Sequence, residues 1–327
     1  MRAIHATVAG GPEVLSVVDV PAPEPGPGEL LVDVAAAGVN FIDTYKRSSV
    51  YPMPFPHVVG EEGAGTVRAV GAGVTEVAPG DRVAWAGAPG SYAEQVLVRA
   101  DVALPVPAGV DLATAAALPL QGMTAHYLVT STFDVRPGHT VLLTAAAGGV
   151  GLLLTQLATA RGARVIGLVG SPQKEALARE AGAAQVIRYT ELDDLTTELP
   201  AMVRDLTGGT GVDVAYDGVG KDTFDASLAS LRRRGMLVLF GGASGQVPPF
   251  DPQRLNAAGS LFLTRPKLAD YTADKAETRW RAGELFDAVA AGTLDVRVGA
   301  RFPLAEAAQA HEALEGRATT GKVLLVP

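Results

Sequence analysis

The sequence predicts an α/β protein in which a doubly wound parallel sheet is inserted into a β-rich domain. Three observations carry this prediction. The chain has 327 residues, more than one hydrophobic core usually holds. Short apolar or alternating runs separated by Gly and Pro fill residues 1–120, whereas strands and helices alternate from about residue 124. A Gly-rich turn joins a strand to a helix within that second region.

The β-rich region contains five candidate strands, and the end of the chain is expected to pack with it. The strands are Ala3–Val8, Glu29–Ala36, Ala64–Val70, Arg82–Trp85 and Tyr92–Val98. The residues from Arg301 onward predict a helix, Leu304–Leu314, and a strand, Lys322–Val326. This tail is too short to fold alone, so we expect it to return to the first domain.

The second region predicts six parallel strands with helices between most of them. The strands are Val141–Thr144, Arg164–Val169, Gln185–Tyr189, Val212–Tyr216, Met236–Phe240 and Ser260–Leu263. The triple arginine Arg232–Arg234 is expected in a solvated turn between a helix and a strand, and a long helix is expected at Ala273–Ala290.

The turn after the first of these strands indicates a dinucleotide site. The residues Gly148, Gly149 and Val150 open a helix, whose N-terminal N–H groups are suited to a pyrophosphate. Gly148 is expected to allow close approach of the backbone to the pyrophosphate, and Gly151 to let the helix pack against the strand. The usual Gly-x-Gly-x-x-Gly pattern has Ala146 at its first position here, so the match is not literal.

The end of the second strand favours a phosphorylated dinucleotide. In NAD-binding units an acidic residue about 20 residues on holds the ribose 2′-OH. No acid occurs in 163–174, and the first is Glu175. Ser171 and Lys174, which follow Gly170, offer a hydroxyl and a positive charge suited to a 2′-phosphate. The alternative is that Lys174 is an ordinary exposed residue in a helix first turn.

Composition restricts the class of protein. The formal net charge of −8 argues against a general nucleic-acid binder, whose footprint would be basic. The absence of cysteine removes disulfides, thiolate nucleophiles and Cys-ligated zinc. No apolar run approaches the ~18–20 residues of a membrane span, and the first ten residues lack the apolar core of a signal peptide. We therefore expect a cytoplasmic protein.

Two segments of the β-rich region carry more polar groups than strands and turns require. The first runs from Gly38 through Asn40 and Tyr45 to Arg47, with Tyr51 shortly after it. The second is Gly60-Glu61-Glu62-Gly63-Ala64-Gly65.

With these segments and others along nearly the whole chain, the sequence resembles the medium-chain dehydrogenase/reductase superfamily, in its quinone oxidoreductase (zeta-crystallin-like) branch. The matching pieces, in order, are 10–15, 40–45, 60–65, 145–151, 216–220, 264–266, Arg317 and 321–322. The resemblance implies a discontinuous GroES-like domain, 1–123 and 266–327, with a Rossmann domain, 124–265, inserted. It also implies a homodimer that pairs the edges of the two nucleotide-domain sheets through Ser260–Leu263.

The chain departs from the zinc-dependent members of that superfamily. Those members carry a zinc-ligand cysteine near the position of Asn40 and Gly-His-Glu in place of Gly60-Glu61-Glu62. The five histidines are scattered without ligand spacing. We therefore expect no metal, not even at His57. Glu61 and Glu62 are expected to make structural hydrogen bonds or to cap the domain interface.

The resemblance implies that Asn40, Tyr45 and Tyr51 line a substrate cleft between the domains, beside the nicotinamide. Asn40 would donate a hydrogen bond to a carbonyl oxygen as charge builds there. The tyrosines would stack on a planar ring, and either one of them or bulk water would supply a proton. The alternative for Tyr45 is that it packs against the core.

Further cofactor contacts are implied by the resemblance alone. Tyr189 would lie beside the 2′-phosphate with Ser171 and Lys174, which favours NADPH. The remaining implied contacts are Thr124, Tyr127, Phe240, Gly241, Gly242, Leu263, Thr264 and Arg317. The alternative for Arg317 is an exposed arginine after a helix.

The leading interpretation is thus a zinc-free, NADPH-dependent quinone reductase, because quinone carbonyls are electrophilic without metal polarisation. A second is reduction of an activated C=C bond in an enone or enoyl thioester. A third is an NADPH-binding protein with a structural or regulatory role, including RNA binding, and the negative net charge argues against it.

Overall fold

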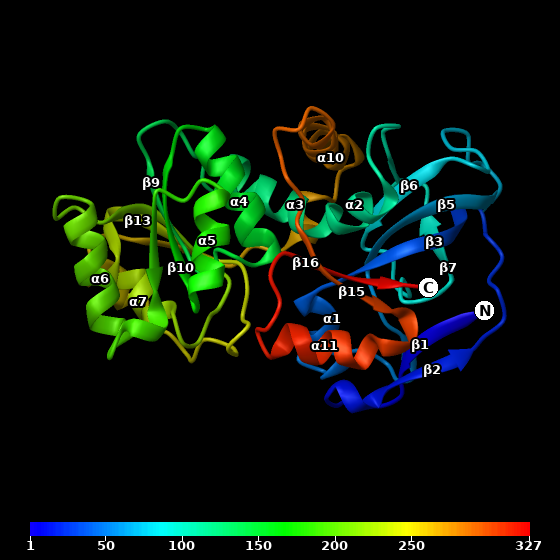
Figure 1. The fold of residues 1–327 in the computed structure, drawn as a ribbon, viewed down its shortest axis with the longest axis horizontal. Helices are drawn as coiled ribbons and strands as arrows, with labels where there is room; N and C mark the ends of the chain where they lie inside the picture. The colour runs from blue at the N-terminus through cyan, green and yellow to red at the C-terminus, as the bar shows by residue number, and fades with distance from the viewer. The chain divides into compact units, whose positions relative to one another are not determined.

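The computed structural model describes residues 1–327, which form two compact units. Unit 1 comprises Met1–Met123 and Tyr271–Pro327, and unit 2 comprises Thr124–Asp270. In Figure 1 unit 1 has the blue, cyan, orange and red segments, and unit 2 the green and yellow ones. Unit 1 is therefore discontinuous in sequence.

Unit 1 is built on two sheets. The larger has seven strands in the order β15-β16-β3-β5-β6-β8, and β7 pairs with β3 outside this path. These strands are β3 (Glu29–Val39), β5 (Glu62–Val70), β6 (Arg82–Ala86), β7 (Gln95–Arg99), β8 (Leu104–Pro105), β15 (Val298–Pro303) and β16 (Lys322–Val326). The smaller sheet has the order β2-β1-β4, made of β1 (Arg2–Ala6), β2 (Leu15–Asp19) and β4 (His57–Val58).

The end of the chain is part of the larger sheet. Strand β16 lies between β15, to which it is parallel, and β3, to which it is antiparallel, with Val323 opposite Val39. The predicted tail helix is a 3-10 turn, η4 (Leu304–Glu306), followed by α11 (Ala307–Glu315). The strand predicted at Lys322–Val326 is confirmed with both of its ends.

Unit 2 contains the predicted six-stranded parallel sheet, in the order β11-β10-β9-β12-β13-β14. The strands are β9 (Thr140–Leu143), β10 (Arg164–Val169), β11 (Gln185–Arg188), β12 (Val212–Asp217), β13 (Leu231–Leu239) and β14 (Phe262–Thr264). Helices α4 (Gly149–Ala160) and α5 (Pro172–Glu180) form one packed pair, and α6 (Leu195–Leu206) and α7 (Phe224–Ala229) form another. The sheet runs between these two pairs (Figure 1).

One expectation about this sheet is wrong. The arginines Arg232–Arg234 are not in a turn before β13 but within it, because the strand already begins at Leu231. Arg232 pairs with Asp213 of β12 at 2.6 Å, and the register shifts beside this pair. Arg234 takes a positive φ of 57°, so the strand continues through an irregularity, and the side chains of Arg233 and Arg234 are exposed.

The remaining helical segments are short, apart from α10. They are η1 (Pro12–Val14), α1 (Phe41–Arg47), α2 (Leu112–Ala117), α3 (Pro119–Tyr127), the π-helix η2 (Leu128–Thr132), η3 (Tyr189–Glu191), α8 (Gln253–Ala257), α9 (Leu268–Tyr271) and α10 (Lys275–Ala290). The N-cap of α10 is Asp274, whose side chain accepts from Glu277 N at 2.9 Å, so the helix begins two residues after the predicted Ala273.

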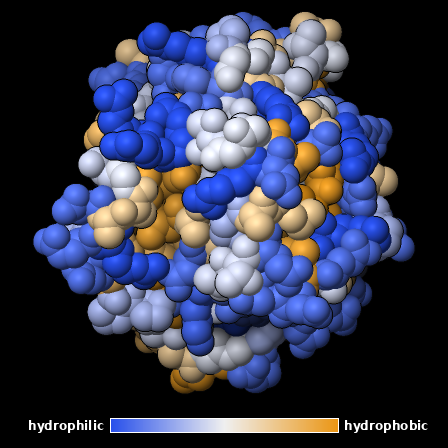
Figure 2. All heavy atoms as spheres, turned by 90° about the vertical axis from the view of Figure 1, so that its left-hand side faces the viewer, coloured by the Kyte–Doolittle hydropathy of each residue, from blue (hydrophilic) through white to orange (hydrophobic).

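Each unit buries its own apolar core. Trp85, Leu30 and Val98 are among the buried residues of unit 1, and Leu142 and Ile166 among those of unit 2. The face that bears α6 and α7 is mostly hydrophilic, with apolar side chains in separate clusters (Figure 2). None of the helices combines the length and the apolar character that crossing a membrane would require.

Candidate active site

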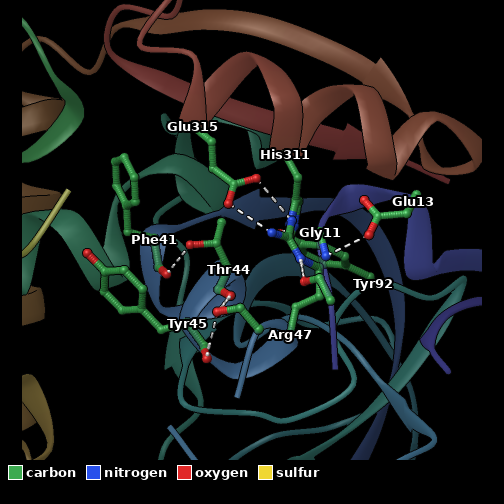
Figure 3. A network of polar contacts seen from close by, with 11 residues as sticks. Gly11, Glu13, Phe41, Thr44, Tyr45, Arg47, Tyr92, His311 and Glu315 are labelled. Atoms are coloured by element: carbon green, nitrogen blue, oxygen red, sulfur yellow. Dashed lines mark hydrogen bonds and ion pairs between the residues drawn. The ribbon is translucent and has the colours of Figure 1, made fainter. Parts of the chain in front are cut away.

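Helix α1 of unit 1 has an inverted distribution of polarity. Its buried residues are Asp43, Thr44 and Arg47, whereas Phe41 and Tyr45 are partly exposed. A surface helix ordinarily buries its apolar face and exposes its charged one. Figure 3 shows the rings of Phe41 and Tyr45 together on one side and the guanidinium of Arg47 among polar groups on the other. Burial of the apolar face therefore does not explain this helix.

The exposed face of α1 forms an aromatic cluster with Tyr51. The rings of Tyr45 and Tyr51 are 5.7 Å apart and nearly perpendicular, at 87°. Phe41 and Tyr45 are 6.1 Å apart and tilted by 32°. Tyr51 is 39% exposed, and its N–H donates to the Tyr45 carbonyl at 3.1 Å. The structure thus brings together the two tyrosines that were predicted from the sequence, on a surface suited to a flat ring.

Asn40 lies at the N-cap of α1 and is almost fully buried. Its Nδ2 donates to Gly38 O at 3.2 Å and to Glu62 Oε2 at 2.9 Å. Its Oδ1 accepts from Lys322 Nζ at 2.7 Å. Both amide hydrogens are thus engaged inside the unit, and none is left for a substrate carbonyl in this arrangement. The geometry makes Asn40 a residue that positions α1.

Glu62 and Lys322 form a buried ion pair beside Asn40. Their side chains are 0% and 1% exposed. The second carboxylate oxygen of Glu62, Oε1, accepts from Leu120 N at 2.7 Å. Gly38 leaves space for this pair, because a Cβ there would lie 2.3 Å from Glu62 Oε2. Glu61 pairs with Lys46, so the structural hydrogen bonds expected of the two glutamates are confirmed.

Lys322 was not predicted to have a role. A lysine at the start of an otherwise apolar strand could have indicated a buried ion pair. The ammonium of Lys322 contacts the oxygens of Asn40 and Glu62, which belong to the two polar segments picked out from the sequence. No group of three or more His, Asp or Glu side chains in the chain is arranged to hold a metal ion.

Buried titratable groups surround the polar side of α1. Burial raises the pKa of the Asp43 carboxyl to about 7, against hydrogen bonds from Asn40 N and Tyr92 that lower it. Burial, together with the neighbouring Arg47, lowers the pKa of His311 to about 3. Burial and the adjacent Asp43 raise the pKa of Tyr92 well above its usual value. His311 could not be singled out among the scattered histidines because its partners are distant in sequence.

In unit 2 the Gly-rich turn connects β9 to α4. Ala145 has a φ of 51° and Gly148 is the N-cap, so Gly149 and Val150 form the first turn of the helix. A Cβ on Gly151 would lie 2.3 Å from Ala145 O, whereas one on Gly148 would lie 3.2 Å from the same atom. Gly151 therefore permits close packing against the turn itself.

Gly170, Ser171, Lys174 and Tyr189 lie together beyond the ends of β10 and β11. Ser171 is the N-cap of α5, and its Oγ accepts from Lys174 N at 3.3 Å. A Cβ on Gly170 would lie 2.6 Å from the Tyr189 hydroxyl, so the phenol rests on this glycine. Glu175, the first acid after β10, is paired with Arg188 at 3.1 Å. Arg188 is a second cation at this place that was not predicted from the sequence.

Asp217 organises the carboxyl end of β12, although from the sequence it was only one residue of a matching motif. It is fully buried and accepts from the backbone N–H groups of Val219 and Gly220 at 2.9 and 3.0 Å. The hydroxyls of Thr223 and Ser227 donate to it at 2.7 Å each. Asp217 thereby fixes the loop that follows β12.

The other expected cofactor residues lie at three places. Phe240, Gly241 and Gly242 follow β13, and the Phe240 ring lies against Gly218. Leu263 and Thr264 end β14, the edge strand. Thr124 and Tyr127 are buried in α3, whereas Arg317 is exposed after α11 in unit 1, with a φ of 56°.

A GroES-like β unit combined with a doubly wound six-stranded sheet defines a medium-chain dehydrogenase/reductase. Residues 26–108 match the alcohol dehydrogenase GroES-like domain, and residues 149–273 match the zinc-binding dehydrogenase family. A quinone oxidoreductase of Pseudomonas aeruginosa is 44% identical over 100% of this chain and 99% of its own length. A 2-haloacrylate reductase of Burkholderia is 42% identical over 97% of this chain and 96% of its own length.

Solved structures agree with these relatives. A mycobacterial protein complexed with NADPH is 53% identical, with a TM-score of 0.97 and full coverage of both chains. The Escherichia coli quinone oxidoreductase complexed with NADPH is 43% identical, with a TM-score of 0.96 and full coverage. The chain belongs to the quinone oxidoreductase family and is an oxidoreductase of the medium-chain superfamily.

Proposed function

We propose that this protein reduces quinones by hydride transfer from NADPH without using a metal ion. The observation that carries the proposal is the aromatic cluster of Phe41 and Tyr45 on α1 with Tyr51 after it. These three rings are partly exposed, whereas the opposite side of α1 is polar and buried. A planar quinone stacks favourably on such rings. Relatives named quinone oxidoreductases, and solved members complexed with NADPH, support the same activity.

The donor set in unit 2 fits NADPH. The N-terminus of α4, from Gly148 to Val150, suits the pyrophosphate. Ser171, Lys174 and Tyr189 suit the 2′-phosphate, because they combine hydroxyls with a positive charge and the nearest acid is already paired. The other proposed cofactor contacts are Phe240, Gly241, Gly242, Leu263, Thr264, Thr124 and Tyr127 of unit 2 and Arg317 of unit 1. When bound, NADPH supplies the hydride.

The chain's own residues hold the acceptor and deliver the proton. Tyr45 and Tyr51 position the ring of the acceptor, and Asn40 fixes the N-terminus of the helix that carries Tyr45. Tyr51 is exposed to bulk water. Either Tyr51 or a water molecule therefore supplies the proton that completes the hydroquinone. The quinone carbonyls are electrophilic without a Lewis acid, which makes positioning the main task of the protein.

Two further proposals concern the state of the protein. We propose a cytoplasmic homodimer, in which copies associate along β14. This strand is an edge of the six-stranded sheet, and its Phe262 is 56% exposed. An unpaired edge with an exposed aromatic side chain is a surface that a second copy can cover.

Steady-state oxidation of NADPH and NADH with a benzoquinone and a naphthoquinone, after EDTA dialysis, tests the function. We expect turnover to survive EDTA and to favour NADPH, and equal rates with NADH would refute the 2′-phosphate assignment. Replacing Tyr45 by Ala is expected to raise the quinone KM about tenfold, the scale of one aromatic contact. Trp280→Ala is the control, because Trp280 is a comparably exposed aromatic of unit 1 at 44%.

A second activity, reduction of an activated C=C bond, is favoured by the similarity to 2-haloacrylate reductase. Hydride delivery to a conjugated alkene needs the same cofactor and no metal. Enones, 2-haloacrylate and an enoyl-CoA, compared with quinones by kcat/KM, separate the two activities. A higher value for any alkene would make that alkene the better substrate and demote quinone reduction.

A further inference from the structure

Four buried side chains form a closed chain of hydrogen bonds that begins and ends on α1. Arg47 Nη1 lies 2.9 Å from His311 Nδ1 of α11. His311 Nε2 lies 3.2 Å from the hydroxyl of Tyr92. Tyr92 in turn donates to Asp43 Oδ2 at 2.9 Å. Figure 3 shows Arg47, His311 and Tyr92 converging on the side of α1 opposite the Phe41 and Tyr45 rings.

The direction of each hydrogen bond in this chain is fixed by its first donor. An arginine guanidinium has no acceptor, so Nδ1 of His311 must accept from Arg47. The imidazole proton is then on Nε2 and is donated to the oxygen of Tyr92. The Tyr92 hydrogen remains for Asp43. Burial holds the pKa of His311 far below its usual value, which keeps the ring in this neutral form.

The chain of bonds ties both ends of α1 to the rest of unit 1. At the N-terminal end, Asp43 Oδ2 also accepts from Asn40 N at 2.9 Å. At the C-terminal end, Arg47 also donates to Gly10 O at 3.0 Å and to Glu315 at 2.8 and 3.1 Å. A helix of seven residues does not hold its shape by itself, and its buried face is polar. Its orientation therefore depends on these directed bonds.

We propose that His311 is a positioning residue for the reaction: it sets the orientation of α1, and hence of the Tyr45 ring, without touching the acceptor. The inference rests on the proposed function, in which Tyr45 contacts the acceptor. His311 is fully buried, so it does not contact the acceptor, and its hydrogen bonds lead to α1 directly through Arg47 and indirectly through Tyr92.

Two substitutions of His311 test the role. His311→Phe removes both the acceptor for Arg47 and the donor to Tyr92, whereas His311→Gln keeps one of each on its amide. We expect His311→Phe to lower kcat/KM for a naphthoquinone about tenfold, as loss of one oriented contact does. The Kd of NADPH, from fluorescence titration, should change less than about twofold, and His311→Gln should restore most of the quinone kinetics.

A double-mutant cycle with Tyr45→Ala separates positioning from a general loss of stability. If His311 acts through Tyr45, His311→Phe has no further effect on quinone kcat/KM once Tyr45 is alanine. Independent, multiplying effects would overturn the proposal. It would also be overturned if His311→Phe lowered the midpoint of thermal unfolding and left the kinetics of the folded enzyme unchanged.

Arg47→Met provides a second variant should His311→Phe fail to fold, and Arg281→Met is its matched control. Both arginines are buried, at 2% and 0% exposed, and each pairs with a partly exposed glutamate, Glu315 or Glu277. We expect only Arg47→Met to impair quinone turnover. If Tyr45→Ala had the quinone kinetics of the wild type, both the proposed contact of Tyr45 with the acceptor and the positioning role of His311 would be refuted. An impaired Tyr45→Ala beside an unaffected His311→Phe would overturn the role of His311 alone.

Discussion

Lys322 of β16 and Glu62 of β5 form an ion pair in the interior of unit 1, although they are 260 residues apart in sequence. Asn40 bonds to both partners, so three strand and helix ends meet at one charged point. A buried pair of this kind contributes little net stability as a whole, but loss of one partner leaves an uncompensated buried charge.

Lys322→Met is therefore expected to lower the free energy of unfolding by about 3–5 kcal/mol. Replacing both partners, in Lys322→Met with Glu62→Leu, should restore part of this loss, because no charge then remains buried. Urea denaturation of the two variants and the wild type measures both effects. A single variant within about 1 kcal/mol of wild type would show that Glu62 finds another partner or a proton at little cost.

The contributions of Asp43 and His311 to the pH dependence of the free energy of unfolding are expected to cancel. Between about pH 4 and 6.5 the unfolded chain has an ionised Asp43 and a protonated His311, from their ordinary pKa values of 3.8 and 6.5. In the folded protein the pKa of Asp43 is about 7 and that of His311 about 3, so the carboxyl is protonated and the imidazole neutral. The folded and the unfolded protein therefore each bind one proton on these two side chains. The pair then contributes nothing to the slope of the free energy of unfolding against pH.

Single substitutions should expose two opposite slopes. In Asp43→Asn the unfolded state binds the extra proton on His311, so stability should rise with pH by about 1.4 kcal/mol per unit up to pH 6.5. In His311→Gln the folded state binds the extra proton on Asp43, so stability should fall by a similar amount per unit as pH rises toward 7. Urea unfolding across this range checks the signs, and parallel curves for both variants would contradict the pairing.

Lys174→Ala should weaken NADPH use selectively. Lys174 is in the first turn of α5, beside the Ser171 cap and the Tyr189 hydroxyl on Gly170. Loss of its charge is expected to raise the NADPH KM about tenfold and to leave the NADH KM nearly unchanged. Lys267→Ala, which removes an exposed lysine of the same unit, is the control. An equal effect on both cofactors would place Lys174 away from the 2′-phosphate.

Gly151→Ala should disturb the packing of α4 against the preceding turn, whereas Gly148→Ala should disturb the close approach of NADPH to the backbone. An added methyl group on Gly151 meets backbone atoms of Ala145 and Ala146 at 2.3–2.9 Å, so the turn must shift. We expect this variant to lose about 1–3 kcal/mol of stability, as overpacked sites do. Gly148→Ala meets only Ala145 O, at 3.2 Å, and should keep its stability while binding NADPH more weakly. Thermal unfolding with and without NADPH distinguishes the two.

Phe262→Asp should prevent association of two copies. The substitution puts a charge on the exposed side of edge strand β14, where a neighbouring strand would have to pair. We expect a dimer for the wild type and a monomer for the variant in sedimentation velocity. Met202→Asp, at a 38% exposed position on α6, should remain dimeric. A monomeric wild type would contradict the proposed assembly.

Four strands of unit 2 were predictable because each has apolar residues at consecutive or alternating positions. The ends of β9, β10, β11 and β12 differ from the prediction by no more than one residue. The prediction missed the first five residues of β13 because three consecutive arginines are atypical of a strand. The pairing of Arg232 with Asp213 of the neighbouring strand accounts for the first arginine.

The candidate site was predictable only where its residues are close in sequence. Tyr45 and Tyr51 lie six positions apart and form a ring pair, as expected of a shared surface. The partners of Asn40 and Arg47 could not be predicted because Lys322 and His311 lie 282 and 264 residues further along the chain. The antiparallel pairing of β16 with β3 brings Lys322 to Asn40, and the contact of α11 with α1 brings His311 to Arg47.

The position of β16 in the sequence also bears on how the protein is made. The ribosome synthesises all of unit 2 between residue 123 and residue 271, before Lys322 emerges. Until then the nascent β5 strand carries Glu62 without its ammonium partner, and α1 lacks the imidazole of His311. Domains generally fold as units during synthesis, so unit 2 is able to fold first and unit 1 closes last. The aromatic face of α1 is therefore assembled only when nearly the whole chain has been translated.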